Sequence, residues 1–416
     1  MKNMPFTRLG MRPELLEAVK ALGYAAPTPI QERSLPETMQ GKDVIGSAMT
    51  GSGKTMAFVI PLLQKLLDDR ASDPHKGGAR VRALVLVPTR ELATQVEKAV
   101  GELAKFSPVK CALIIGGASF TTQRDSLKRG AEVVCATPGR LLDLLRSGDL
   151  HLRDVKVAVL DEADRMLDMG FMPDVRRIMQ LLPKDRQTLM FSATIPPEVE
   201  RVVNEFMRSP VRVEVDRPRS TATSVKQWIY PVTEGQKGEL LAAIVQSDGV
   251  DSVIVFTRTK ARADYVAHCL NRKKIDCGVL HSDLTQSARD RAMQDFRDGK
   301  ITILVATDLA ARGLDVPEVS HVINYDVPEH ADDYVHRIGR TGRAFTEGDA
   351  VTLVSFEEER MMPGIEAFIG QEIPRKALEG FQYLVPPRLH SYKPPMSSKF
   401  RIRRSIPRGG GSRFKR

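Results

Sequence analysis

The feature that most constrains the fold of this chain is a repeated unit, in which a short apolar run is followed at once by polar side chains. The runs are rich in β-branched residues and end in hydroxyl groups, arginines or carboxylates. Continuous apolar runs of this length are typical of strands buried on both faces of a parallel sheet. The runs of the first half are 83–87, 131–136, 157–160 and 188–191, and those of the second half are 252–256, 278–280, 301–306 and 321–325.

Helical patterns alternate with these strands, as at Leu141 to Leu145. Such alternation predicts an α/β fold with doubly wound parallel sheets, whose chemistry lies along the edge where the strands end. A length of 416 residues exceeds one ordinary core, so we predict two domains in tandem. The predicted parts are a first domain at 1–215, a linker at 216–224, a second domain at 225–380 and a disordered basic tail at 381–416.

Composition narrows the class of protein. The content of 42% hydrophobic and 27% charged residues is that of a globular protein, and no apolar run approaches the roughly 20 residues needed to cross a bilayer. The four cysteines have neither metal-ligand spacing nor a disulfide pattern, which favours reduced thiols and a cytoplasmic protein. We expect a monomer without membrane contact.

The net charge of +10 lies entirely in the tail. From residue 380 to 416 there are ten Lys or Arg and no Asp or Glu, which leaves 52 basic against 52 acidic residues elsewhere. Such an arm is attracted to polyanions. Its aromatic residues Phe381, Tyr383, Tyr392 and Phe400 either stack on nucleic-acid bases or dock the first part of the tail onto the second domain.

A glycine-rich stretch predicts a phosphate-binding loop. It runs from Ala48 to Thr55 and precedes an apolar helix. Glycines let backbone N–H groups surround a phosphate, while Lys54 reaches the outer phosphates and the Thr55 hydroxyl can ligate Mg²⁺. Ala48 stands where the strict pattern has glycine, and the alternative is an ordinary glycine-rich turn.

Three carboxylates follow the strand 157–160, namely Asp161, Glu162 and Asp164. Charge at the end of a buried strand is costly unless a cation or a reacting group lies opposite. The alternative is an acidic turn that caps the next helix.

Two further patterns indicate ligand contacts. Prolines on both sides of Thr28 predict an extended, fixed loop, in which Tyr24 could stack on a purine and Gln31 could pair with an adenine edge. In the second half, arginines separated by glycines at 334–343 suit anion contacts that reach a site built elsewhere, although a solvated face is the alternative.

The order of the motifs resembles that of the DEAD-box RNA helicases over residues 6 to 380. The resemblance rests on Gly-Tyr-x-x-Pro-Thr-Pro-Ile-Gln, Ala-x-Thr-Gly-Ser-Gly-Lys-Thr, Pro-Thr-Arg-Glu-Leu-Ala, Thr-Pro-Gly-Arg, Asp-Glu-Ala-Asp, Ser-Ala-Thr, Ala-Arg-Gly-Leu-Asp and His-Arg-Ile-Gly-Arg-Thr-Gly-Arg. The run around Asp-Glu-Ala-Asp-Arg-Met-Leu-Asp-Met-Gly-Phe resembles the bacterial RhlE-type branch. Met49 and Ser282 depart from residues common in the family.

This resemblance implies two RecA-like domains that use ATP and Mg²⁺. It implies Glu162 as general base, with Lys54, Asp161, Arg340 and Arg343 also catalytic, and Thr55 and Asp161 (through water) at Mg²⁺. The implied nucleotide contacts are Phe6, Tyr24, Thr28, Gln31, Thr50, Gly51, Ser52, Gly53, Lys54, Thr55, Gly313 and Asp315. A polar link between the nucleotide and RNA sites is implied for Asp164, Ser192, Thr194 and His336.

The same resemblance implies RNA as partner, single-stranded or as a short duplex, bound without sequence preference. The implied RNA contacts are Pro88, Thr89, Arg90, Gly117, Thr137, Gly139, Arg140, Arg258, Gln286, Arg289 and Thr307. The expected function is RNA-stimulated ATP hydrolysis coupled to domain closure, local unwinding and remodelling of ribosomal or RNA-degradation assemblies. The alternatives are an ATP-gated RNA clamp with little strand separation and a DNA helicase.

Overall fold

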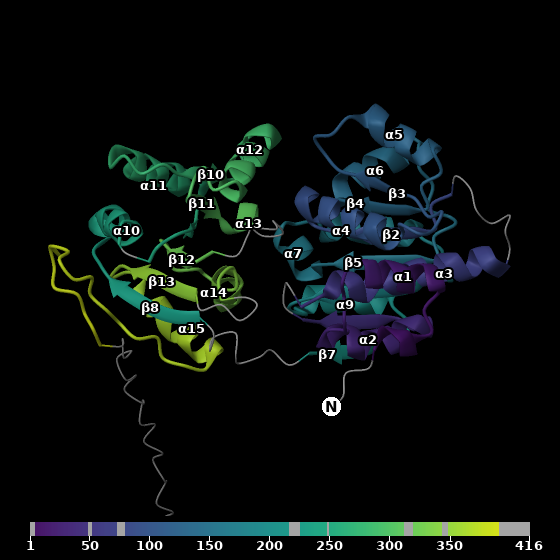
Figure 1. The fold of residues 1–416 in the computed structure, drawn as a ribbon, viewed down its shortest axis with the longest axis horizontal. Helices are drawn as coiled ribbons and strands as arrows, with labels where there is room; N and C mark the ends of the chain where they lie inside the picture. The colour runs from purple at the N-terminus through teal and green to yellow at the C-terminus, as the bar shows by residue number, and fades with distance from the viewer. Residues whose placement is uncertain are drawn as a thin grey trace, which may run out of the picture.

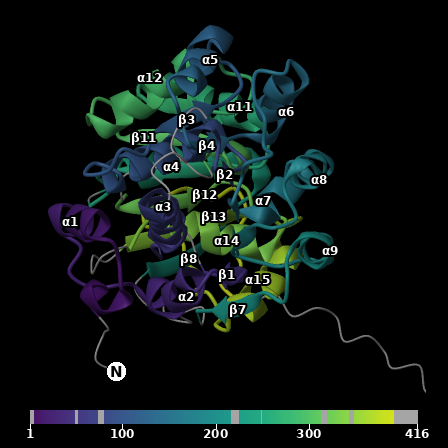
Figure 2. The same cartoon turned by 90° about the vertical axis from the view of Figure 1, so that its right-hand side faces the viewer.

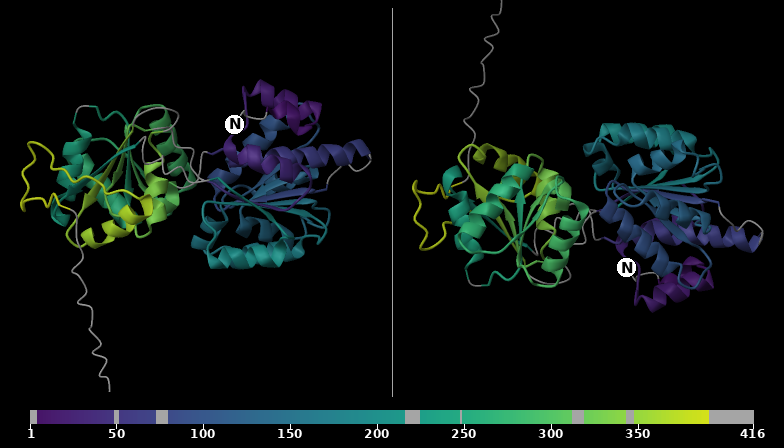
Figure 3. Two further views of the ribbon diagram at one scale, coloured as in Figure 1. Left: turned by 90° about the horizontal axis from the view of Figure 1, so that it is seen from below. Right: turned by 90° about the horizontal axis from the view of Figure 1, so that it is seen from above.

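The computed structural model describes residues 5–48, 52–72, 80–215, 225–247, 249–311, 319–342 and 348–390. The described residues form two α/β lobes side by side, each a sheet with helices on both faces (Figures 1 and 3). In the same residues, no helix combines the length and the apolar character that crossing a membrane requires.

The first lobe contains a seven-stranded sheet in the order β3-β4-β2-β5-β6-β1-β7. All pairings in it are parallel. Its elements are η1 (Phe6–Leu9), α1 (Pro13–Ala21), α2 (Pro29–Met39), β1 (Val44–Ser47), α3 (Lys54–Ser72), β2 (Ala83–Leu86), α4 (Arg90–Leu103), β3 (Cys111–Ile114), α5 (Phe120–Lys128), β4 (Val133–Ala136), α6 (Pro138–Arg146), β5 (Val157–Asp161), α7 (Ala163–Asp168), α8 (Met172–Leu181), β6 (Gln187–Ser192), α9 (Pro197–Phe206) and β7 (Val211–Glu214).

The second lobe contains a six-stranded parallel sheet in the order β10-β11-β9-β12-β13-β8. Its elements are β8 (Val225–Pro231), η4 (Glu234–Gln236), α10 (Lys237–Val245), β9 (Val253–Thr257), α11 (Lys260–Arg272), β10 (Gly278–Leu280), α12 (Gln286–Arg297), β11 (Ile303–Thr307), α13 (Asp308–Ala311), β12 (His321–Asn324), α14 (Ala331–Ile338), β13 (Gly348–Val354), η5 (Glu359–Met361) and α15 (Met362–Ile369). The predicted α/β class with two doubly wound parallel sheets is confirmed. Strand bounds differ from the predicted ones by at most two residues, and the apolar runs named in the sequence do not include β1, β3, β7, β8 or β13.

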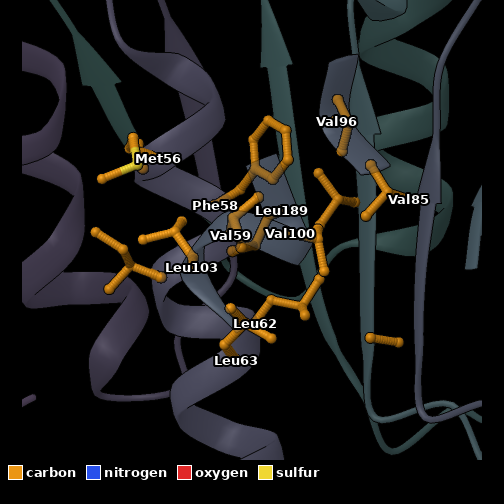
Figure 4. Close-up of a cluster of buried hydrophobic side chains, with 14 of the residues drawn as sticks. Met56, Phe58, Val59, Leu62, Leu63, Val85, Val96, Val100, Leu103 and Leu189 are labelled. Atoms are coloured by element: carbon orange, nitrogen blue, oxygen red, sulfur yellow. The ribbon is translucent and has the colours of Figure 1, made fainter. Parts of the chain in front are cut away.

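The strands are continuously apolar because both faces of each sheet are covered. In β5, Val157 and Val159 pack toward α3 and α4, whereas Ala158 and Leu160 pack toward α6 to α9. Figure 4 shows the first of these clusters, where side chains of α3 and α4 meet those of the strands. Burying one valine or leucine side chain contributes about 1.5–3 kcal/mol, so packing on both faces stabilises β5 in the middle of the first lobe. Figure 2 shows the molecule from the side of the first lobe.

The C-terminal segment passes along the outside of the second lobe (yellow in Figure 1). Ile229 of β8 donates its N–H to the Pro374 carbonyl at 2.9 Å and accepts from the Lys376 N–H at 2.8 Å. Phe381 and Tyr383 pack against the lobe, and their rings lie 4.8 Å apart between centroids. Of the two interpretations of the tail aromatics, docking is the one seen for this pair. Tyr392, Phe400 and the linker 216–224 lie outside the described residues.

Candidate functional site

The phosphate loop is held by the segment around Thr28. The Gln31 amide Nε2 donates a hydrogen bond to the Gly53 carbonyl at 2.9 Å. Gly53 has φ +92°, and a Cβ there would lie 2.5 Å from Gln31 Nε2 and 2.8 Å from Thr28 Oγ1, so only glycine fits. Lys54 begins α3 next to it and is buried. Ser52 and Thr55 flank this pair, while Thr50 and Gly51 lie outside the described residues.

The loop expected around Thr28 is shorter than predicted. Thr28 is extended, but Pro29 begins α2, and Gln31 lies in the first turn of that helix rather than in a loop. The prediction was wrong on this point because proline is favoured at the first helical position, where its missing N–H has no partner to lose. A capping box fixes the turn, since the Thr28 N–H donates to Gln31 Oε1 at 3.0 Å.

Two aromatic residues expected near the base differ in exposure. Tyr24 is 47% exposed and can reach a ligand, whereas Phe6 is 4% exposed and lies in the first-lobe core. Phe6 therefore supports the surrounding helices.

Asp161 is the last residue of β5 and is 3% exposed. Burial raises its pKa to about 7 from an ordinary 3.8, although the positive charge of Lys54 opposes the rise. One carboxylate oxygen accepts the Glu162 N–H at 3.0 Å. A buried carboxylate in this condition favours a cation close by.

Glu162 joins β5 to α7 in a left-handed conformation, with φ 53° and ψ 52°. Such a backbone is uncommon for a residue with a side chain and is typical of functional sites. Arg165 donates from Nη1 to Glu162 Oε2 at 2.9 Å, and both side chains are largely buried. The sequence analysis missed Arg165, although its three-residue spacing from Glu162 in a helix was a signal.

Asp164 fastens the end of β5 to the end of β6. Its Oδ2 accepts from the Ala193 N–H at 3.1 Å, the Thr194 N–H at 2.8 Å and the Thr194 hydroxyl at 3.0 Å. The Asp164 N–H donates to the Ser192 hydroxyl at 3.0 Å. Burial works to raise the pKa of Asp164, but hydrogen bonds with Thr194 and Ser192 outweigh it and lower the pKa.

Two arginines flank the turn that follows β3. Arg90 lies so close to Gly117 that a Cβ on this glycine would be 2.2 Å from Arg90 Nη1. Arg140 donates to the Ala118 carbonyl at 3.0 Å and stacks on Phe120, with 4.6 Å from its guanidinium carbon to the ring centroid. Both guanidinium groups therefore lie at one strand-end edge. Near them, Pro88 and Thr89 are buried after β2, Thr137 precedes α6, and Gly139 is exposed in its first turn.

Two of the second-lobe residues expected to contact RNA meet the first lobe directly. Arg289 Nη2 lies 2.8 Å from Glu91 Oε1, and Gln286 Nε2 donates to the same oxygen at 3.4 Å. Both come from α12, which lies on the side of the second lobe that faces the first (Figure 1). The sequence analysis missed Glu91, because no local spacing links residues that are 195 positions apart.

The remaining second-lobe residues lie around the ends of β9, β11 and α14. Arg258 follows β9, Thr307 ends β11 and is buried, and His336 is half-buried on α14. Arg340 follows α14 and is 6% exposed. Arg343, Gly313 and Asp315 lie outside the described residues.

Known proteins with matching sequences decide the family. Residues 28–202 match the DEAD/DEAH box helicase family, and residues 236–345 match the helicase conserved C-terminal domain. The chain is 39% identical over 393 residues to the DEAD-box ATP-dependent RNA helicase CshA of Bacillus anthracis, which covers 93% of this chain and 73% of that protein. The chain belongs to the DEAD-box RNA helicases. It is accordingly an RNA-dependent ATPase, and ATP is its nucleotide.

Other relatives of this helicase agree. The ATP-dependent RNA helicase vasa of Drosophila melanogaster is 43% identical over 358 residues, covering 85% of this chain and 53% of vasa. The structure is similar to S. cerevisiae Dbp5 bound to RNA and ADP BeF3, with a TM-score of 0.78, 32% identity and coverage of 90% and 95% of the two chains. It is also similar to the DEAD-box helicase Mss116 bound to ssRNA and UDP-BeF, with a TM-score of 0.80, 27% identity and coverage of 92% and 81%. The finer resemblance to the RhlE-type branch stays a prediction.

Proposed function

We propose that this helicase couples ATP hydrolysis to closure of its two lobes on RNA, and thereby opens short RNA duplexes locally. The observation that carries the proposal is the division of the site. The phosphate loop, Asp161 and Glu162 belong to the first lobe, whereas Arg340 belongs to the second. An arginine supplied by a separate domain contributes about 10³–10⁵ in the rate of phosphoryl transfer, so hydrolysis becomes conditional on closure.

The nucleotide-binding residues divide into those that contact the base and those that bind the phosphates. Gln31 and Tyr24 face the adenine, with Thr28 setting the position of Gln31. Lys54 and the backbone from Ser52 to Thr55 bind the phosphates. We add Gly313 and Asp315, which the family resemblance implies as nucleotide contacts. We also add Arg343, which the resemblance implies as a second catalytic arginine beside Arg340.

The donors present fit Mg²⁺. Asp161 is a carboxylate buried at the end of β5 with its pKa raised to about 7, and Mg²⁺ takes oxygen ligands from one or two carboxylates together with phosphates and water. The Thr55 hydroxyl and, through water, the buried Asp161 would hold it. When bound, the ion neutralises charge on the transferring phosphate.

Glu162 orients and deprotonates the attacking water. Its left-handed backbone joins β5 to α7, and Arg165 of α7 fixes the carboxylate through Oε2. We assign Oε1 to the water. A positioned general base of this kind contributes about 10²–10⁴-fold in rate.

RNA binds across the strand-end edges of both lobes, and its binding favours the closed state. Arg90 and Arg140 contact phosphates from the first lobe, and Arg258, Gln286, Arg289 and Thr307 from the second. Asp164 links this edge to the nucleotide through Ser192 and Thr194, with His336 reaching the link from the second lobe. Coupling of this kind is reciprocal, so ATP tightens RNA binding by the same factor as RNA tightens ATP binding.

Contacts to sugar and phosphate carry no sequence information, so we infer that the helicase binds RNA without sequence preference. We propose that it acts in ribosome assembly or RNA turnover in the cytoplasm. Discrimination against DNA rests on 2′-hydroxyl contacts. A strand-displacement assay on blunt and tailed short duplexes separates unwinding from the clamp alternative. Equal stimulation of the ATPase by single-stranded DNA would favour the DNA helicase.

Glu162→Gln tests the proposal. We expect RNA-stimulated phosphate release to fall by about 10²–10⁴-fold, while ATP-dependent RNA binding is kept, because the amide cannot accept the proton. The matched control is Glu200→Gln, which alters a partly exposed pair with Arg212 and should leave the rate unchanged. Phosphate release by Glu162→Gln at the wild-type rate would contradict the assignment.

A further inference from the structure

A buried network of charged residues lies behind the strand-end edge of the second lobe, and Glu358 is at its centre. Glu358 follows β13 and is 8% exposed. Its Oε1 accepts from the Val327 N–H at 3.1 Å and from Arg258 Nη2 at 3.3 Å. Its Oε2 accepts from Lys237 Nζ at 2.5 Å and from the Ser355 N–H at 3.1 Å. One carboxylate thus joins the ends of β9, β12 and β13 with the start of α10.

Lys237 neutralises this buried carboxylate. Its side chain is fully buried, and Nζ also donates to the Tyr325 carbonyl at 2.9 Å. Asp326 is the second buried carboxylate of the network, and its Oδ1 lies 3.9 Å from the same Nζ. A satisfied network of this kind makes a rigid support, because each member is held by several partners.

Arg258 belongs to this network and also opens to the edge where RNA is proposed to bind. The backbone N–H of Arg258 donates to Asp326 Oδ2 at 2.8 Å, which fixes the backbone of Arg258. Its Nη2 is shared between the Val327 carbonyl at 3.2 Å and Glu358 Oε1. The Arg258 side chain nevertheless stays 40% exposed. One side of the guanidinium is therefore anchored through Nη2, while Nε on the other side lies 3.8 Å from Oε1 of Glu329, whose side chain is exposed.

We propose that Glu358 is a positioning residue for RNA binding, which holds the Arg258 guanidinium in the orientation that receives an RNA phosphate. The inference rests on the proposed contact between Arg258 and RNA. A guanidinium presents its donors in a fixed plane, so anchoring Nη2 sets the direction of the remaining donors. Ordering a free arginine on binding weakens affinity by about 3- to 10-fold, and Glu358 removes that loss.

A double-mutant cycle tests the role. The dissociation constant for a short labelled single-stranded RNA, with a non-hydrolysable ATP analogue, is measured for the wild type, Glu358→Gln, Arg258→Ala and the double variant. We expect Glu358→Gln to weaken binding about 3- to 10-fold. The double variant should bind like Arg258→Ala, because Glu358 acts through that arginine. Additive losses would overturn the positioning role, whereas Arg258→Ala at wild-type affinity would overturn the proposed RNA contact itself.

Glu366→Gln is the matched control in the same lobe. Glu366 Oε1 accepts from Arg375 Nη1 at 3.2 Å and from the Ile373 N–H at 3.0 Å, so it also joins an arginine and a backbone amide, but on α15. We expect this variant to lower the melting temperature of the second lobe, monitored by Trp228 fluorescence, with RNA affinity unchanged. An equal loss of RNA affinity would mean a global effect and would overturn the inference.

Arg258→Lys keeps the test decisive if Glu358→Gln fails to fold. Lysine retains the positive charge but lacks the planar fork that binds Val327, Glu358 and an external phosphate together. We expect Arg258→Lys to bind RNA nearly as weakly as Arg258→Ala. Wild-type affinity in Arg258→Lys would show that charge alone suffices and would overturn the positioning role.

Discussion

Replacement of Asp161 by asparagine should stabilise the first lobe at alkaline pH in the absence of nucleotide. Burial raises the pKa of this carboxyl to about 7, against an ordinary 3.8. Between these two values the unfolded chain has lost the proton, whereas the folded chain keeps it. Folding therefore takes up a proton, and stability falls as the pH rises through this interval. The stabilising contribution is complete below pH 3.8 and is lost above pH 7.

The size of the effect follows from the same two values. From pH 5 to pH 8 the wild type passes through about two pH units in which folding is coupled to protonation. Each unit corresponds to about 1.36 kcal/mol, so the free energy of unfolding should fall by about 3 kcal/mol relative to Asp161→Asn. Other titrating groups are common to both proteins and cancel in this difference.

Urea unfolding of both proteins at pH 5 and pH 8 measures the effect. Far-UV circular dichroism follows both lobes, while the single tryptophan, Trp228, lies in β8 and reports on the second lobe alone. The second-lobe transition should be the same in both proteins and serves as an internal control. A difference between the two proteins that is equal at pH 5 and pH 8 would refute the reasoning, because the buried carboxyl would then titrate alike in folded and unfolded chains.

Two further changes test the RNA-binding surface. Gly117→Ala should weaken RNA binding about tenfold, because Gly117 has φ +79° and the new Cβ displaces the Arg90 guanidinium. A tenfold loss corresponds to one charge-assisted hydrogen bond. Fluorescence anisotropy with labelled RNA measures the dissociation constant. Gly101→Ala, a helical glycine with no atom within 4 Å of the added Cβ, is the matched control, and equal weakening by both changes would contradict the reasoning. Deleting residues 391–416, which hold nine Lys or Arg, should weaken RNA binding and flatten its salt dependence, by about 0.7 in log–log slope for each RNA phosphate that the tail neutralises. An unchanged slope after truncation would exclude phosphate binding by the tail.

The structure changes the interpretation of the carboxylate cluster at the end of β5. The sequence left open a helix-capping role for these three residues. Their environments differ, since Asp161 is buried opposite Lys54, Glu162 is paired with Arg165, and Asp164 is bonded to the end of β6. Burial raises the pKa of Asp161 to about 7, which favours a cation close by, whereas hydrogen bonds lower the pKa of Asp164. The cluster therefore divides into three separate functions within four positions.

The local sequence pattern was sufficient to predict those features that depend on residues close together in the chain. Apolar runs predicted the strands of two covered sheets, because a strand buried on both faces has no polar position. The phosphate loop was also predictable from the sequence, because its glycines and Lys54 are neighbours in the chain and bind phosphate through local backbone geometry. The edge strands β7 and β8 were missed, because they are only partly buried and carry polar residues.

The tertiary structure alone decided which distant residues hold the functional ones in place. Glu91 meets Arg289 from the other lobe, and Glu358 meets Arg258 across 100 positions of sequence. A carboxylate in either place has no distinguishing pattern in the sequence, because its partner is chosen by how the sheets stack and where their strands end. The sequence thus determined the fold and the family of this helicase, whereas packing determined the orientation of the side chains that carry its chemistry.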